Sequence, residues 1–414
     1  MSDQRRAQFG AYLASLRRTK RWSQSQLAER LCASTGVDSV TRSEVSRWEH
    51  GKRIPESWLP QLAIAFGIPL HEIQNAAAYA RGDTAARLPI PNPALAELLP
   101  QASEFTSAGS TLGRRIGKNE VSLIAARAHA LRLADDVLSG GDLLPTAVRE
   151  LEAATHLFKE TYHSGETSRQ LLSVIAEMAQ ITGWISSDAG RCEESERVYR
   201  LGISAAREAD DAPVTANLIS SLAYHLSNVP GREQDAVWLA QAAVSAGRTA
   251  TPRARAVFFD RIAWAQTRTE DAEVAMKALN DAHDALSKES DTNEPQWAYW
   301  VNRLELEVMD ARVYTELRRP LRAVPLLTRI MSQYDASYTR ETALYRSWLA
   351  IALADANEPE QAAYEAEQVL SSMSALTSDR VTERARVVLR RLGEFDAVPA
   401  VQSLRREHMY LLER

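Results

Sequence analysis

Apolar residues recur every three or four positions along almost the whole chain, the spacing that places them on one face of an α-helix. The first of these faces belongs to Phe9, Leu13 and Leu16. After residue 120 proline is sparse, and no run alternates between apolar and polar residues as a half-buried strand would. The sequence therefore predicts an all-α protein. Near the N-terminus, the further apolar faces are Leu27, Ala28 and Leu31, then Val45 and Trp48, and then Leu59, Leu62, Ala63 and Phe66.

Two of these helices carry recognisable start signals. Ser23 is followed three residues later by Gln26, and Thr41 by Glu44, the spacing of a capping box. Gly51 supplies a stop signal after the second helix, and Pro55 prevents its continuation. The pattern predicts two consecutive short helices in the segments 23–31 and 41–50.

A change of composition divides the chain. Residues 82–119 contain Pro89, Pro91, Pro93 and Pro100 and then a stretch of small residues. Closely spaced prolines favour extended backbone and remove amide donors. We predict a domain at 1–81, a linker at 82–119 with a short helix at 93–99, and a second domain at 120–414.

The second domain repeats itself. Five segments read as helix, turn and helix, and each has a small residue soon after the turn, at intervals of 39 to 48 residues. A leading pair is predicted at 120–160 and terminal helices at 380–392 and 400–412. Stacked helical pairs bury their apolar stripes and leave a concave surface, which we expect the first helix of each pair to line. The five small residues are Ser195, Ala236, Ala275, Ala323 and Ala362.

Charge separates the two domains further. The formal net charge is −5, but residues 1–81 hold twelve basic and seven acidic side chains, a balance of +5. The remainder of the chain therefore carries −10. A basic N-terminal domain is suited to binding a polyanion, whereas the acidic second domain would be repelled by that polyanion.

The strings SQSQLAERL (23–31), SRWEHGKRIP (46–55) and LAIAFGI (62–68) resemble the helix-turn-helix of the phage-repressor (XRE/Cro) family. The resemblance covers about residues 5–73. The stretch 32–40 is about seven residues longer than the family's usual turn. The additional residues either extend the first helix of the pair or enlarge the loop after it. The resemblance implies binding to double-stranded DNA, usually as a homodimer on a palindromic operator.

The second helix of this motif would lie in the major groove, with its first residues on base edges. Arginine can pair bidentately with guanine. We expect Gln24 and the basic residues after the helix, Lys52 and Arg53, to contact phosphate, with non-specific attraction from Arg17, Arg18, Lys20 and Arg21. Glu44 completes a capping box or reads cytosine, and Trp48 belongs to the core. The residues predicted on the reading helix are Arg42, Ser43, Glu44, Ser46 and Arg47.

Roughly residues 170–375 resemble tetratricopeptide (TPR) repeats, most closely at Gly183, Trp184, Tyr199 and Ala205. An irregular helical bundle is the alternative. The combination of both domains resembles peptide-sensing, quorum-sensing regulators of Gram-positive bacteria. That resemblance implies that a peptide or other small effector binds in the concave surface, where asparagines on inner helices hold its backbone.

Several inner-helix residues fit such a role, although aromatic residues on repeat helices often only pack between helices. An asparagine amide offers both a donor and an acceptor to a peptide bond. His225 shares a predicted helix face with Asn217, Ser221 and Tyr224. Trp297, Trp300 and Arg303 are expected on a later inner helix, and Trp348 on the last. The effector-binding candidates are Asn217, Ser221, Tyr224, Arg261, Trp264, Asn302 and Tyr345.

Several function classes are disfavoured. The chain has no phosphate-binding glycine loop, nucleophile elbow or HExxH motif, so we expect neither an enzyme nor a cofactor. The eight histidines show no ligand spacing, and Cys32 and Cys192 form no CxxC pair, so no metal site is expected. No apolar run is long enough to span a bilayer. We expect a soluble cytoplasmic protein with no membrane partner. Its composition resembles that of actinomycete proteins.

The sequence thus predicts a sequence-specific DNA-binding transcriptional regulator whose repeat domain senses an effector and dimerises. The alternative is a DNA-anchored scaffold whose repeats dock a partner protein.

Overall fold

The computed structural model describes residues 2–20, 22–35, 39–66, 68, 70–83, 95, 98–100, 105, 115–288, 294–333, 339–373 and 379–412. It divides the chain into two compact units, Met1–Leu98 and Leu99–Arg414. Apart from an isolated bridge between Arg115 and Tyr162, the described residues are helices and their connections. The predicted all-α class is confirmed.

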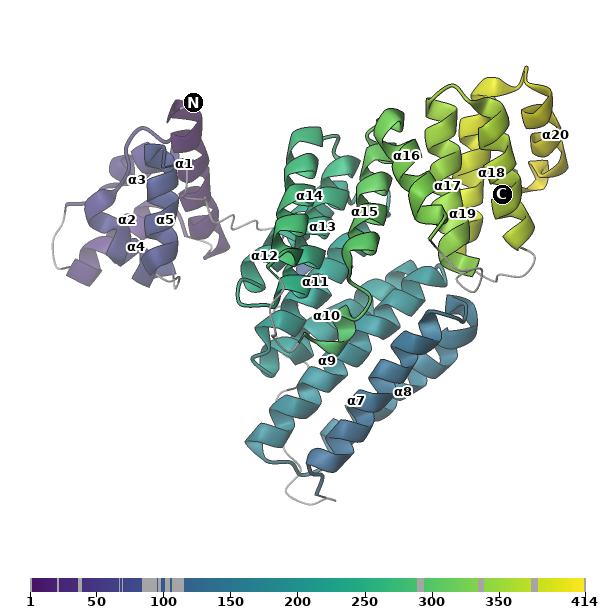
Figure 1. Cartoon of the computed structure of the whole chain (residues 1–414). Coiled ribbons are helices and arrows are strands. Elements are labelled where there is room, and N and C mark those ends of the chain that lie inside the picture. The colour runs from purple at the N-terminus through teal and green to yellow at the C-terminus, as the bar shows by residue number, and fades with distance from the viewer. Residues whose placement is uncertain are drawn as a thin grey trace. The chain divides into compact units, whose positions relative to one another are not determined.

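The first unit packs short helices around one core (Figure 1). The four apolar faces named from the sequence are all buried in it. A further helix, with Ile73, Ala76 and Ala77 wholly buried, completes the core. The elements are α1 (Ser2–Thr19), α2 (Gln24–Thr35), α3 (Arg42–Glu49), η1 (Glu56–Trp58), α4 (Leu59–Phe66) and α5 (Leu70–Arg81).

The second unit stacks helical pairs in chain order. The leading pair is α7 (Lys118–Asp135) and α8 (Gly140–Glu160). The five predicted repeats follow as α9 (Gly165–Asp188) and α10 (Cys192–Glu208), α11 (Ala212–Leu226) and α12 (Glu233–Ala246), α13 (Pro252–Arg268) and α14 (Ala272–Leu286), α15 (Arg303–Glu316) and α16 (Pro320–Met331), and α17 (Thr339–Asp355) and α18 (Pro359–Met373). The end is formed by α19 (Asp379–Leu392), η3 (Gly393–Phe395), α20 (Pro399–Glu407) and η4 (Met409–Leu411).

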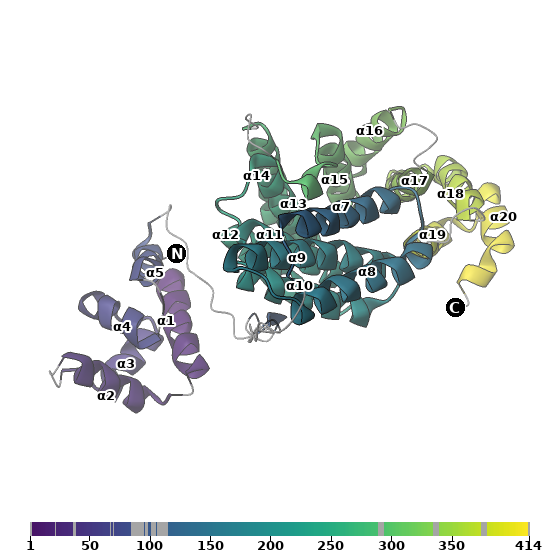
Figure 2. The same ribbon diagram turned by 90° about the horizontal axis from the view of Figure 1, so that it is seen from below.

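The pairs pack through the small residues that mark the repeat. All five, from Ser195 to Ala362, have no exposed surface, because each lets the second helix of its pair approach its neighbours closely. Gly183 on α9 works in the same way, since a Cβ there would lie 2.7 Å from the ring of Tyr199 on α10. In Figure 2 the second helices α12, α14, α16 and α18 lie toward the outside of the array.

The predicted linker differs in part from the structure. Much of 82–119, including most of the predicted helix at 93–99, lies outside the described residues. Its C-terminal part belongs to the second unit, because Phe105 and Ile116 are buried there. The ring of Phe105 meets that of Phe158 edge-on at 5.6 Å, and Arg207 donates a hydrogen bond to the carbonyl of Pro100.

Four of the five turns inside the pairs share one backbone conformation. The helices α9, α13, α15 and α17 are each followed within two residues by a residue in the left-handed region: Gly190, Glu270, Arg318 and Asn357. At Glu270, with φ of 60°, the next amide, that of Asp271, closes a hydrogen bond of 3.0 Å to the carbonyl of Gln266. This conformation is costly for residues that carry a Cβ.

We therefore expect Glu270→Gly to raise the free energy of unfolding by about 1 kcal/mol, because Glu270 is exposed and strained. Urea denaturation measures the effect. Lys277→Gly, at an exposed position in the interior of α14, is the matched control and should lower stability by about 1 kcal/mol. Equal effects of the two changes would contradict the assignment of strain to Glu270.

Candidate functional site

The start of α3 is fixed by a cap. The amide of Glu44 donates to Oγ1 of Thr41, which has extended backbone, at 3.3 Å. Val45 and Trp48 are buried on one face of the helix. The opposite face is therefore presented to solvent, and it carries the predicted reading residues: Arg42, Ser43 and Arg47 are exposed and Ser46 is half-buried.

The end of α3 is equally defined. Gly51 has φ of 68°, and the amides of Gly51 and Lys52 donate to the carbonyls of Trp48 and Arg47 at 3.0 and 2.9 Å. This is a Schellman cap, which turns the chain sharply after the helix. Lys52 and Arg53 follow it and are exposed on the same unit.

Glu44 does not complete a capping box. Its carboxylate instead pairs with Arg47 at 2.8 Å and with Arg53 at 3.5 Å, although both arginines remain mostly exposed. Exposed ion pairs of this kind contribute less than about 1 kcal/mol, so both guanidinium groups can exchange Glu44 for a stronger anion. No ion pair of Arg42 is found within the described part of the unit.

Gln24, predicted to contact phosphate, and Arg17, predicted to add non-specific attraction, both form hydrogen bonds within the N-terminal unit. Arg17 donates two hydrogen bonds, of 2.6 and 2.9 Å, to the carboxylate of Glu49, and Gln24 donates a third of 2.7 Å. Glu49 is nearly buried, and its carboxylate raises the pKa of the Arg17 guanidinium. The guanidinium of Arg17 on α1 is therefore paired with Glu49 on α3. The side-chain amide of Gln24 connects α2 to the same Glu49 carboxylate.

The long stretch between α2 and α3 is partly helical. The first helix extends to Thr35, four residues beyond the predicted end at 31, and the thiol of Cys32 donates to the carbonyl of Val40 at 3.4 Å. Residues 36–38 lie outside the described part of the chain. The additional length therefore leaves the capped start of α3 intact.

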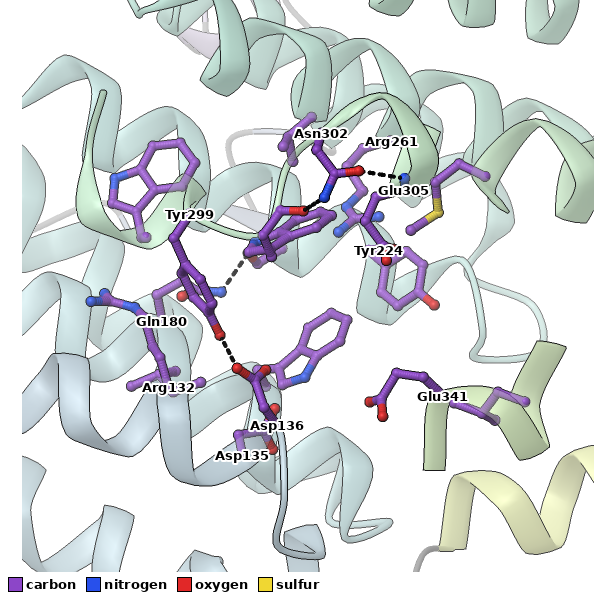
Figure 3. Close-up of a pocket in the computed structure, with 18 of the residues that line it drawn as sticks. Arg132, Asp135, Asp136, Gln180, Tyr224, Arg261, Tyr299, Asn302, Glu305 and Glu341 are labelled. Atoms are coloured by element: carbon purple, nitrogen blue, oxygen red, sulfur yellow. Dashed lines mark hydrogen bonds between the residues drawn. The ribbon is translucent and has the colours of Figure 1, made fainter. Parts of the chain in front are cut away.

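The second unit contains a cavity of about 550 Å³, which we call the inner cavity. It is lined by the first helices of successive pairs, α7 to α17, and by α19, with the segment before α15. Figure 3 shows part of this lining. Aromatic residues form much of the wall: Trp184, Tyr224, Trp297, Tyr299, Trp300 and Tyr345.

The structure brings six of the seven effector candidates to this cavity: Asn217, Ser221, Tyr224, Arg261, Asn302 and Tyr345. Trp264 does not line it. Its ring is buried and meets that of Trp348 edge-on at 5.6 Å. His225 does not line it either. Its Nδ1 lies 2.9 Å from the hydroxyl of Ser187, and burial lowers the pKa of its imidazole.

Asn302 reaches the cavity differently from the prediction. It is the N-cap of α15, where its side-chain oxygen accepts from the amide of Glu305 at 3.0 Å and its nitrogen donates to the carbonyl of Trp300 at 3.2 Å (Figure 3). Trp297 lies in η2 (Gln296–Ala298) and Trp300 in the turn that follows, while Arg303 begins α15. The expected inner helix across these residues is therefore wrong.

Of the charged residues in the wall, the sequence predicts only Arg261 as a binding candidate. Four arginines and four carboxylates line the cavity: Arg132, Arg261, Arg312, Arg380, Asp135, Asp136, Glu305 and Glu341. Two carboxylates are held by phenol groups, since Tyr299 donates to Asp136 at 2.6 Å and Tyr345 to Glu305 at 3.2 Å. The available signal was a charged residue among buried apolar neighbours, such as Arg312 between Ala311 and Val313.

Three guanidinium groups act on Tyr224. Burial alone would raise the pKa of its phenol, but Arg312, Arg380 and Arg261 outweigh burial and lower the pKa to about 8. Arg312 donates to the phenol oxygen at 2.8 Å, and Arg261 lies over the ring at 4.4 Å. On Tyr199, Tyr299 and Tyr314 burial outweighs the nearby arginines, and their pKa values are raised.

We expect ultraviolet difference absorption to show one phenol ionising with a midpoint of about pH 8. A lowered pKa means that the folded state favours the phenolate, so this titration adds to stability as the pH rises from about 8 toward 10. Tyr224→Phe should remove the titration, and Arg312→Gln should move it upward. A spectrum in which all phenols ionise near pH 10 or above would contradict this assignment.

Residues 8–76 match the family model described as a helix-turn-helix domain. The match covers α2 and α3 and supports a DNA-binding regulator. No curated protein matches the chain. Within the described ranges, no helix is long and apolar enough to cross a membrane, and no three metal-ligating side chains come together.

Proposed function

We propose that this protein is a transcriptional regulator that reads DNA with α3 and senses a small effector, such as a short peptide, in the inner cavity. The observation that carries the proposal is the helix-turn-helix match together with the exposed face of Arg42, Ser43 and Arg47. Arginines at the start of a reading helix can donate bidentately to guanine, with about 1–3 kcal/mol of discrimination for each pair.

The size and lining of the inner cavity support the effector. Its volume of about 550 Å³ lies within the range of about 300–1,000 Å³ that holds drug-sized ligands. Aromatic walls with a few convergent polar groups are typical of such sites. Asn217, buried on α11 at the cavity wall, offers an amide that matches a peptide bond.

Dimerisation is part of the proposal. One helix-turn-helix reads only a few base pairs, and two copies read half-sites about one DNA turn apart. Two-fold symmetry of the protein then requires an operator with matching symmetry. An effector that binds one conformation of the repeat unit better than another would shift the population of DNA-competent dimers.

Coupling between the two sites tests the proposal. A library of tri- to pentapeptides is screened by thermal shift on the full chain, and each hit is then added to the protein on a DNA duplex obtained by selection. We expect at least one peptide to raise the melting temperature and to change DNA affinity about 5- to 150-fold. Hits that leave DNA affinity unchanged would contradict effector sensing. A stable co-purifying protein, with no peptide hit, would favour the scaffold alternative.

A further inference from the structure

The inner cavity contains a buried cation that pairs with no carboxylate among the described residues. Arg312 on α15 has 7% of its surface exposed. None of the carboxylates in the described residues lies within 4.0 Å of its nitrogens, whereas Arg261 pairs with Asp260 at 2.9 Å and Arg380 with Asp188 at 3.6 Å. The partners of Arg312 are the phenol oxygen of Tyr224 and the sulfur of Met309, and its Nε has no hydrogen-bond partner.

Aromatic rings hold this guanidinium in place. It lies over the rings of Trp264, Trp348 and Tyr224 at 4.6, 5.4 and 5.6 Å. Cation–π contacts compensate only part of the cost of burying a charge, which normally requires a hydrogen-bonded anion. The rings therefore fix the orientation of Arg312 at the cavity wall without neutralising its charge.

A second guanidinium lies on the same phenol. Arg261 is also almost fully buried and lines the cavity, its Nε has no hydrogen-bond partner, and its planar group lies over the ring of Tyr224. Asp260 already neutralises it. Around Tyr224 the wall thus offers two oriented guanidinium forks, unmatched N–H donors and one positive charge, that of Arg312, with no paired carboxylate.

We propose that the inner cavity binds a small carboxylic acid, with its carboxylate against Arg312 and its apolar body against the aromatic wall. A planar guanidinium fork matches a carboxylate, and the bond between them is charge-assisted. Trp184, Trp297 and Trp300 supply apolar surface for the rest of the ligand. This inference rests on the proposed function, because it specifies the chemistry of the effector.

The test uses matched acids and amides on the full chain. The probes are phenylacetate, indole-3-acetate and decanoate with their primary amides, tripeptides with free and with amidated C-termini, and inorganic phosphate. Thermal shift and tryptophan fluorescence report binding. We expect carboxylates to bind at least about 10-fold more tightly than their amides. Comparing the organic acids with the tripeptides shows whether the ligand is an organic acid or the C-terminus of a peptide. Equal binding of acids and amides, binding of phosphate alone, or no binding at millimolar carboxylate would overturn the proposal.

Variants separate a binding role of Arg312 from a structural one. Arg312→Met is expected to weaken carboxylate binding at least about 10-fold while leaving the melting temperature of the ligand-free protein unchanged or higher, because a buried charge that pairs with no carboxylate is removed. Arg312→Lys keeps the charge but loses the fork and should bind with intermediate affinity. Arg268→Met, on α13 but outside the cavity, is the control and should bind normally. A lower melting temperature of ligand-free Arg312→Met with unchanged binding would show that Arg312 only supports the core.

The outcomes also distinguish this inference from the proposed function. Carboxylate binding that depends on Arg312 but leaves DNA affinity unchanged would support the site and contradict effector sensing. An uncharged probe that binds in place of the carboxylates and changes DNA affinity would support effector sensing and contradict the proposal that the effector is a carboxylic acid.

Discussion

Replacing Arg42 and Arg47 with alanine is expected to abolish sequence-specific DNA binding while leaving the protein folded. Both side chains lie on the exposed face of α3, opposite the buried Val45 and Trp48. Each base-contacting arginine should contribute about 1–3 kcal/mol, so each single change should weaken binding to the preferred duplex roughly 5- to 150-fold. Fluorescence anisotropy on preferred and scrambled duplexes measures the loss, which should be much smaller on the scrambled one.

Two further variants make this result specific. Arg81→Ala removes an exposed arginine of α5 that pairs with Glu56, away from α3, and should leave site preference unchanged. Lys52→Ala should weaken binding to both duplexes alike and lower the salt slope by about one, as expected for a phosphate contact. If both Arg42→Ala and Arg47→Ala kept the preference of the parent, α3 would not be the reading helix.

Glu49→Ala is expected to destabilise the N-terminal unit selectively. Its carboxylate accepts hydrogen bonds from Arg17 and Gln24, so it joins α1, α2 and α3 at one buried point. Removing one member of a buried ion pair costs about 3–5 kcal/mol, because the other charge is left without a partner. A unit of this size has a total stability of only about 5–10 kcal/mol.

Calorimetry of the full chain measures this effect. The transition of the N-terminal unit should fall by at least about 12 °C while that of the repeat unit stays in place. Glu56→Ala is the matched control, since its ion pair with Arg81 is half-exposed and should contribute less than about 1 kcal/mol. A transition unchanged by Glu49→Ala would mean that the Arg17–Glu49 pair does not hold the helices together.

Helical periodicity was sufficient to predict the cores. Val45 and Trp48 are buried as their spacing indicated, since an apolar stripe on a short helix has few alternatives. The small residues Ser195 and Ala236 are wholly buried for a related reason: close packing of helix pairs tolerates no larger side chain there. Local rules thus predicted the elements and their stacking.

Contacts between distant segments could not be predicted in this way. Glu49 joins Arg17 and Gln24 across 32 and 25 positions, and no local pattern marks such a pairing. The sequence predicts Asn302 on an inner helix, because periodicity does not reveal a capped turn. Arg312 becomes notable only once α11, α13 and α17 surround it with aromatic rings.

Selection of bound DNA from a random pool by the full-length protein tests the central claim most directly. The account predicts that one defined, two-fold symmetric sequence is enriched, and that the double variant of Arg42→Ala and Arg47→Ala enriches none. Enrichment of the same sequence by the parent and the double variant, or no enrichment by the parent at physiological salt, would contradict it.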